Sequence, residues 1–224
     1  MTSALILSGA GRYADPWHPF AQTSAGLAEI LTGCGVTVTI ATDVDAAMTR
    51  LDGVDLLVVN AGDSSRNDLP APDLTAPDLT AARAGFAAAL ERGIAVLGTH
   101  TAAASLADYP EWETVLGGRW LPDHSMHPPI GPARITLHAG RHPIVAGLAD
   151  FDTHDERYSH LRVAADVVAL AAHTQGGVEQ PLLWARTAGA SRVVYSALGH
   201  DARAYQSPEL RELLARAIRW LTER

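Results

Sequence analysis

A sharp turn from a strand into a helix is predicted by residues 93–102, whose sequence is Gly93-Ile94-Ala95-Val96-Leu97-Gly98-Thr99-His100-Thr101-Ala102. The apolar run predicts a buried strand, the glycine lets the chain turn, and small helix formers follow the histidine. Such an elbow holds one side chain above the carboxyl end of a sheet, at the N-terminus of a helix. That position usually carries Cys or Ser, whereas here it carries His100. The elbow therefore predicts a site without the usual covalent chemistry.

Strand and helix patterns alternate on the N-terminal side of this elbow. The expected strands are 4–7, 36–41, 55–60 and 94–97, and the expected helices are 19–31, 43–51 and 78–92. Residues 63–76 are rich in Pro, Asp and Ser and predict a loop. This alternation is typical of a mostly parallel sheet with helices on both faces. It predicts an α/β fold, a three-layer α/β/α sandwich.

The C-terminal half has a less regular pattern. Strands are expected at 133–138, 167–173, 182–186 and 192–198, partly antiparallel, with a short helix at 109–116, a loop at 117–130, a turn at 142–147 and a polar segment at 152–158. Ser207 and Pro208 predict the start of a last helix, whose leucines recur at helical spacing. Because no linker or repeat interrupts the chain, residues 1–224 are expected to form one domain.

Composition limits the classes of function. The chain has 224 residues, 47% of them hydrophobic, and a formal net charge of −8 with scattered basic residues, so nucleic acid is not an expected partner. A lone cysteine, Cys34, excludes an internal disulfide and is typical of a reducing compartment. The N-terminal apolar run is short and lacks basic residues, and no run is long enough to span a membrane. We therefore expect a cytoplasmic protein that does not enter membranes.

Polar and small residues follow four of the expected strands. They are Ser8, Gly9, Gly11, Tyr13 and His18 after the first strand, Asn60, Gly62 and Asp63 after the third, Thr99 and His100 after the fourth, and Gly199, His200 and Asp201 after the last. Ligands of open parallel sheets bind beyond the carboxyl ends of the strands. The four strand ends therefore predict one site at that rim.

His100 has several possible roles there. It could ligate a metal, act as a general acid or base, or donate a hydrogen bond to a substrate; alternatively it only caps the helix. A helix N-terminus lowers the pKa of a nearby imidazole and favours its neutral form, which is also the form that binds metal.

Two further segments bear candidate residues. Residues 117–124 form a glycine-rich turn that could bring His124 over the site or leave it on the surface, and His127 is a weaker candidate. In residues 153–158, adjacent carboxylates on a strand point to opposite faces, so only one of Asp155 and Glu156 faces the site directly. Glu156 is favoured, and the other carboxylate is expected to orient a neighbour or pair with an arginine.

The last strand ends in Leu198-Gly199-His200-Asp201. His200 is a second candidate acid or base, with Asp201 orienting its ring. The alternative is an exposed histidine beside an aspartate that caps a helix.

The sequence lacks the motifs that several common types of catalysis and cofactor binding require. The elbow has no cysteine, and the sequence contains no G-x-S-x-G, Walker, HExxH or paired CxxC motif, while Ser8-Gly9-Ala10-Gly11 is only half of a dinucleotide-binding loop. A metal site would therefore be assembled from distant loops.

The chain resembles the trehalose-utilisation, or ThuA-like, family over nearly its whole length. The motifs that carry the resemblance are Gly98-Thr99-His100-Thr101-Ala102, Leu116-Gly117-Gly118 with His124, His142-Pro143-Ile144, Asp155-Glu156-Arg157-Tyr158, Ala197-Leu198-Gly199-His200-Asp201 with Tyr205 and Pro208, and Ala217-Ile218-Arg219-Trp220-Leu221. The resemblance implies a flavodoxin-like fold of the class I glutamine amidotransferase type without the catalytic cysteine, and a connection to sugar metabolism. The short loop 9–13 and the proline-rich segment 63–76 depart from the family pattern, which affects what the pocket accepts.

The leading hypothesis is an enzyme acting on a sugar or an oxidised sugar derivative. The candidate catalytic residues are His100, His200, Glu156 and Asp155; the candidate substrate-binding residues are Tyr13, Asn60, Asp63, Trp120, Tyr158 and Asp201; and the candidate metal ligands are His18, His100 and His124, for Zn²⁺ or a similar ion. The alternatives are a non-catalytic ligand-binding or assembly module and a metal-dependent hydrolase of a small amide or ester. A homodimer is a further expectation, in which Trp17, Trp112 and Trp120 belong either to a dimer interface or to a pocket.

Overall fold

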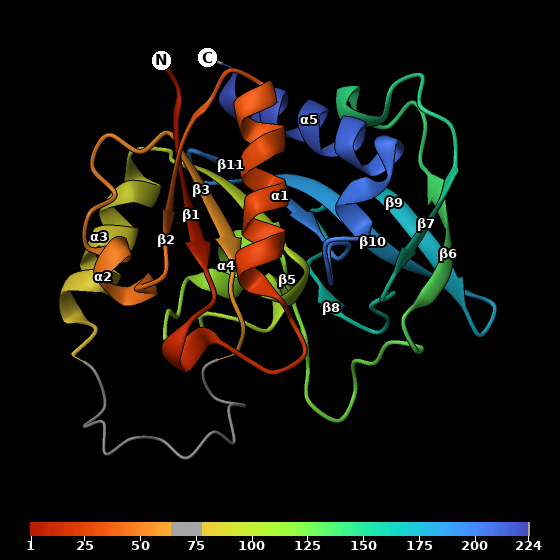
Figure 1. Cartoon of the computed structure of the whole chain (residues 1–224), viewed down its shortest axis with the longest axis horizontal. Coiled ribbons are helices and arrows are strands. Elements are labelled where there is room, and N and C mark those ends of the chain that lie inside the picture. Colours follow the sequence, from red (N-terminus) through yellow and green to blue (C-terminus); the bar gives the residue numbers. More distant parts are fainter. Residues whose placement is uncertain (64–77, 224) are drawn as a thin grey trace.

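A nine-stranded sheet forms the centre of the computed structural model, which describes residues 1–63 and 78–223 (Figure 1). The strand order is β2-β1-β3-β4-β11-β10-β9-β6-β7. The expected loop at 63–76 lies outside the described residues except for Asp63.

Five neighbouring strands are parallel, and they confirm the α/β fold. They are β2 (Thr37–Ala41), β1 (Ser3–Ser8), β3 (Leu56–Asn60), β4 (Ala95–Thr99) and β11 (Ser191–Ser196). Strands β3 and β4 are buried throughout, as continuous apolar runs predict for a sheet covered on both faces. Their carboxyl ends lie at one edge, from which the loops below the sheet in Figure 1 emerge.

The other half of the sheet is antiparallel. It contains β10 (Val178–Ala188), β9 (Val168–Gln175), β6 (Gly131–Leu137) and β7 (Phe151–Asp155), and a small separate ladder pairs β5 (Gly118–Arg119) with β8 (Arg162–Val163). Strand β7 occupies much of the expected polar segment 152–158. Its polar residues are compatible with a strand because β7 is the edge of the sheet and has one partner, β6.

Helices cover both faces of the sheet. Figure 1 shows α1 (Phe20–Gly33) and α5 (Pro208–Thr222) in front of it, where they pack against each other. On the other face lie α2 (Val44–Met48), α3 (Thr80–Glu91) and α4 (Trp112–Leu116). Helix α5 begins as predicted, since the Ser207 hydroxyl accepts a hydrogen bond from the Leu210 amide at 3.2 Å. Short 3-10 turns complete the chain at η1 (Gly11–Tyr13), η3 (Pro143–Val145) and η4 (Ala204–Gln206).

The elbow after β4 forms, but the helix expected after it does not. The chain makes a single 3-10 turn, η2 (His100–Ala103), and three residues later Leu106 has a φ of 52°, which no helix allows. His100 itself has a φ of 42°, in the left-handed region that residues other than glycine rarely adopt. Gly98 is needed just before the turn, since a Cβ there would lie 2.5 Å from a Leu116 methyl group.

Within the described part of the chain, no helix combines the length and apolar character needed to cross a membrane.

Candidate functional site

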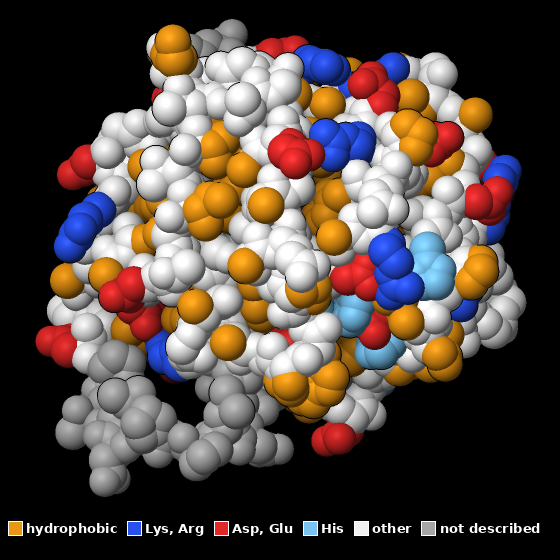
Figure 2. Space-filling model, viewed as in Figure 1, with side chains coloured by type: hydrophobic (Ala, Val, Ile, Leu, Met, Phe, Trp, Pro, Cys, Tyr) orange, Lys and Arg blue, Asp and Glu red, His pale blue; other side chains and the backbone are white. Residues whose placement is uncertain are grey.

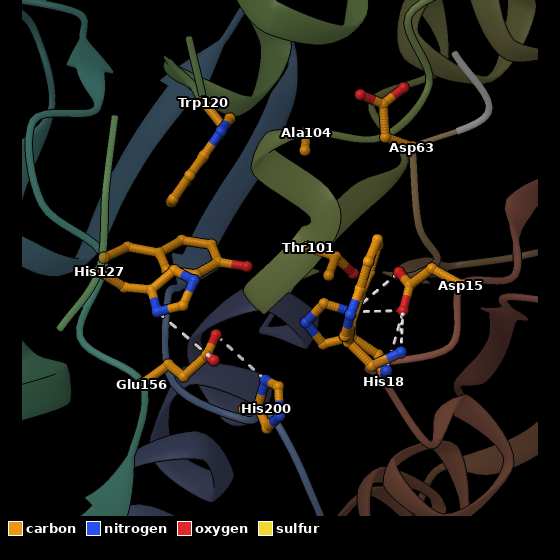
Figure 3. Close-up of a pocket in the computed structure, with 11 residues that line it drawn as sticks. Asp15, His18, Asp63, Thr101, Ala104, Trp120, His127, Glu156 and His200 are labelled. Atoms are coloured by element: carbon orange, nitrogen blue, oxygen red, sulfur yellow. Dashed lines mark hydrogen bonds and ion pairs between the residues drawn. The ribbon is translucent and has the colours of Figure 1, made fainter. Parts of the chain in front are cut away.

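A cavity of about 470 Å³ opens at the carboxyl edge of the parallel strands. Its lining comes from the loops after β1, β3, β4 and β11, from the loop at 120–127 and from the chain after β7 (Figure 3). The lining residues are Asp15, Trp17, His18, Asp63, Thr101, Ala104, Trp120, His127, Glu156, Tyr158 and His200. The sequence prediction of a site where several strand ends meet therefore corresponds to a real cavity.

Three histidines and one carboxylate meet at the floor of this cavity. One ligand atom from each of His18, His100, Glu156 and His200 lies within 4.8 Å of the other three. A carboxylate oxygen of Glu156 is 3.1 Å from His200 Nδ1 and 3.5 Å from His100 Nε2, and these two nitrogens are 3.3 Å apart. We refer to these four residues as the histidine cluster.

His100 is the innermost member. Its side chain is 1% exposed, and its Nδ1 lies 2.6 Å from the carbonyl oxygen of Ala197. A carbonyl can only accept, so Nδ1 carries the proton and Nε2 presents a lone pair to the cluster. Burial lowers the pKa of His100 to about 4, against the opposing effect of Glu156. The neutral form agrees with the sequence prediction, although burial rather than a helix terminus is its main cause.

His18 is held by a neighbour three residues earlier. Its Nδ1 lies 2.8 Å from both carboxylate oxygens of Asp15, which also accept from the backbone amides of Trp17 and His18 (Figure 3). Burial opposes ionisation of Asp15, but these hydrogen bonds outweigh it and hold its pKa below the usual value. His18 Nε2 is buried and has no hydrogen-bond partner among the described residues.

Glu156 and His200 form the open side of the cluster. Burial disfavours the charged form of each, but the hydrogen bond and the attraction between the Glu156 carboxylate and the His200 imidazole outweigh it. The pKa of Glu156 therefore lies well below its usual range, and the pKa of His200 is raised. The other oxygen of Glu156 lies 3.4 Å from Nδ1 of His127.

Asp155 faces away from the cavity, as expected for the neighbour of Glu156 on a strand. It is fully buried and accepts hydrogen bonds from the backbone amides of Gly199 at 2.7 Å, Glu156 at 2.9 Å and His200 at 3.1 Å. Burial raises its pKa to about 7. Asp155 therefore fixes the turn that carries His200 and does not line the cavity.

Aromatic rings form the cavity walls. Tyr158 stacks on His100 with ring centroids 4.3 Å apart, and Trp120 meets Tyr158 at 4.6 Å. Trp17 is 66% exposed although it lines the cavity, so it stands at the mouth. Asp63 adds a carboxylate opposite Glu156 (Figure 3).

Besides Asp155, four candidate residues lie outside both the cavity lining and the histidine cluster. The Tyr13 hydroxyl is 2.8 Å from Asp45 in a half-buried network, and the Asn60 amide donates to the hydroxyls of Thr23 and Ser24 at 2.9 Å.

His124 and Asp201 are the other two. His124 is exposed, with its ring 5.9 Å from that of His160, because the 120–127 loop presents His127 to the cavity instead. Asp201 pairs with Arg203 at 2.9 Å and does not orient the His200 ring.

The tryptophans considered for a dimer interface have different environments. Trp112 is fully buried in the core and donates to the carbonyl of Ala102 at 2.8 Å, so it is inaccessible to a partner, whereas Trp17 and Trp120 line the cavity. Cys34 lies beside α5, 3.8 Å from the carbonyl of Ala215, and is remote from the elbow.

The sequence analysis did not assign several lining residues to the site. They are Asp15, Trp17, Thr101 and Ala104, while His127, the weaker of the two histidine candidates in its loop, does line the cavity. A usable signal existed for Asp15, since a carboxylate three residues before a histidine in a turn can hold that imidazole in place. Thr101 and Ala104 line the cavity because the chain after the elbow turns tightly along it.

A family model described as ThuA, trehalose utilisation, matches residues 4–221. A ThuA-like protein of Bacteroides uniformis is similar in structure, with a TM-score of 0.74 and 20% identity over 98% of this chain and 91% of that one. A second, from Parabacteroides merdae, has a TM-score of 0.76 and 18% identity over 99% and 89%.

The fold extends to amidotransferase-type proteins. The PurLQS structure from Thermotoga maritima has a TM-score of 0.57 and 10% identity over 98% of this chain and 99% of that one. No curated protein sequence matches the chain.

Proposed function

The chain belongs to the ThuA family of trehalose utilisation, and from this premise we propose that it is an enzyme that binds a sugar or an oxidised sugar derivative in the cavity above the histidine cluster. The observation that carries the proposal is the composition of the cavity. Aromatic walls stand over a floor of imidazole and carboxylate groups.

The size and lining of the cavity suit a small polyhydroxylated ligand. A volume of about 470 Å³ lies within the usual range for small-molecule sites. The indole of Trp120, which Tyr158 supports from beside it, offers a flat apolar surface to the C–H face of a sugar ring, while Asp63 and Glu156 can accept hydrogen bonds from its hydroxyls.

The floor of the cavity supplies groups that suit proton transfer. His200 and Glu156 are 3.1 Å apart, line the cavity and are held by Asp155 behind them. Hydroxyl and carbonyl groups of a sugar exchange protons with such side chains when they come within hydrogen-bond reach. Covalent catalysis by a cysteine at the elbow is excluded because His100 occupies that position.

Calorimetric titration with trehalose, glucose and their keto derivatives tests the proposal. We expect at least one of them to bind, and the Trp120→Ala variant to bind it about 10-fold more weakly, corresponding to about 1.4 kcal/mol. Trp220→Ala is the matched control, because Trp220 packs beside His142 and Arg192, away from the cavity.

Three outcomes are informative. Binding that Trp120→Ala weakens and Trp220→Ala does not, together with turnover of the bound compound, supports the enzyme. The same binding with no turnover of any sugar in the panel favours a non-catalytic ligand-binding module on an amidotransferase-type fold. Absence of binding across the panel would contradict the proposal.

A further inference from the structure

We propose that the histidine cluster binds one divalent transition-metal ion through Nε2 of His18, Nε2 of His100, Nδ1 of His200 and a carboxylate oxygen of Glu156. Within residues 1–63 and 78–223 this is the one group of side chains with ligand atoms so close together. The inference goes beyond the proposed function, because a metal can be detected without any sugar.

The spacing of the ligand atoms fits a metal. Zn–N and Zn–O distances of about 2.0–2.1 Å at tetrahedral angles place neighbouring ligand atoms about 3.3 Å apart. The three separations among His100, His200 and Glu156 are 3.1, 3.3 and 3.5 Å. The His18 atom lies within 4.8 Å of the others, so the four ligand atoms must draw closer together around a bound ion.

His18 and His100 each use their second ring nitrogen in a hydrogen bond of the kind that metal-binding histidines make. A metal-bound imidazole almost always donates its second N–H to a carboxylate or a backbone carbonyl. Here Asp15 holds Nδ1 of His18 and the Ala197 carbonyl holds Nδ1 of His100. Both Nε2 lone pairs are thereby left for one common partner.

An unsatisfied atom gives independent support. His18 Nε2 is buried and has no hydrogen-bond partner among the described residues. An imidazole nitrogen left in this way costs free energy, since burial removes its hydrogen bond to water. A metal ion at the centre of the cluster would supply the missing interaction.

Backbone features hold the other ligands in place. His100 keeps a φ of 42°, a strained conformation for a histidine, and such strain is concentrated at functional sites. Asp155 fixes the backbone amides of Glu156 and His200 from behind. The ligands therefore come from three separate loops and the end of β7, but their positions are set by the fold.

The donor set indicates the class of metal. Three imidazoles and one carboxylate suit Zn²⁺, Fe²⁺, Ni²⁺ or Co²⁺, whereas Mg²⁺ and Ca²⁺ prefer oxygen ligands. His18, Glu156 and His200 also line the cavity, so the ion would be reached from the side on which a small ligand enters.

Titration of the full-length, tag-free and chelator-stripped protein with Zn²⁺ and, separately, Mg²⁺ tests the proposal. We expect one equivalent of Zn²⁺ to bind and Mg²⁺ not to bind. His18→Ala and Glu156→Gln should weaken Zn²⁺ binding by on the order of 100-fold or more, and Asp15→Asn by roughly 10–100-fold, the usual cost of losing an outer partner. Circular dichroism of each variant establishes that it is folded.

His124→Ala is the matched control, because His124 is an exposed histidine outside the cluster. It should bind Zn²⁺ as the unmodified protein does. Weak binding of several equivalents, or an equal loss in His124→Ala and His18→Ala, would overturn the proposal, as would the absence of binding. A protein that binds a sugar but no metal ion would contradict only this inference. A protein that binds the metal ion but none of the sugars would contradict only the proposed function.

Discussion

Two polar clusters lie within the same half of the molecule and differ in how completely their atoms are paired. In the first, Asp45 of α2 accepts hydrogen bonds from Tyr13, Tyr109 and Arg12 at 2.7–3.0 Å, and Arg12 also binds Asp108 at 2.7 Å. We refer to this group as the aspartate cluster. The second is the histidine cluster, in which a buried nitrogen of His18 has no partner among the described residues.

The difference in hydrogen bonding distinguishes polar groups that stabilise the fold from polar groups that are available to a ligand. In the aspartate cluster, donors surround both oxygens of one carboxylate and join η1, α2 and the chain before α4, so the network stabilises the fold. In the histidine cluster, Glu156 and His200 face a cavity and one imidazole is incomplete. Figure 2 shows histidine side chains gathered beside acidic ones at the surface, where a ligand can reach them.

The largest expected effect comes from the histidine cluster. His200→Ala should lower kcat/KM for the sugar substrate by about 10²–10⁴-fold, the usual contribution of a proton-transferring group. The midpoint of thermal unfolding should change little, because His200 makes few contacts that stabilise the core. Steady-state kinetics and calorimetry measure the two quantities, with His124→Ala as the control. Activity retained by His200→Ala would show that the histidine cluster is not the catalytic site.

Asp45→Ala should lower the stability of the fold and leave ligand binding unchanged, the opposite of the effect expected for His200→Ala. Removing the central carboxylate takes one of its acceptors from Arg12, which keeps Asp108, and takes the Asp45 acceptor from two tyrosine hydroxyls. The loss of these hydrogen bonds to a charged group should lower the unfolding free energy by about 3 kcal/mol or more. Urea unfolding measures this loss. Affinity for the sugar and for Zn²⁺ should remain unchanged in the folded protein. A variant that is stable but binds neither would show that the two clusters are not separate.

Tyr13→Phe tests the same comparison at a single hydroxyl group, which donates to Asp45 and accepts from Arg12. The loss of a bond to a charged group should lower the unfolding free energy by about 1.5–3 kcal/mol. Sugar affinity should not change, since the Tyr13 hydroxyl contacts Asp45 and not the cavity. A weaker affinity for sugar with unchanged stability would restore Tyr13 as a substrate-binding residue.

The smallest effect concerns pH. Burial opposes ionisation of Asp45, but hydrogen bonds from Arg12, Tyr109 and Tyr13 outweigh it and hold its pKa below the usual value. A lowered folded-state pKa means that Asp45 stabilises the fold above its unfolded-state pKa, about 4, and that this contribution decreases as the pH falls through the folded-state value.

Urea unfolding of the unmodified protein and of Asp45→Asn between pH 6 and pH 2 isolates this contribution. The difference in unfolding free energy between them should shrink toward acid pH. A difference that is constant or grows as the pH falls would contradict the account of the aspartate cluster.

The residues nearest the strand ends were the most predictable part of the site. His100 and Glu156 follow strands directly, His200 comes four residues after β11, and the period of a strand places Glu156 and Asp155 on opposite faces. Their backbone positions are fixed by the sheet, so sequence spacing alone brings them to one rim.

Loop residues were not predictable in the same way. His124 and His127 are three residues apart on one loop, and tertiary contacts decide which of them faces the cavity. Tyr13 and Asn60 also follow strands, but buried partners elsewhere in the fold direct their side chains inward. The missing helix after His100 has a similar cause, since the small residues after the elbow pack under Trp112 in a tight turn.

X-ray anomalous scattering at the zinc edge, from crystals of the protein grown with Zn²⁺, tests the central claim most directly. We predict one strong anomalous peak within bonding distance of His18, His100, His200 and Glu156. A peak only at surface histidines such as His124, or none in a crystal that contains zinc, would contradict the assignment of the histidine cluster as the functional centre.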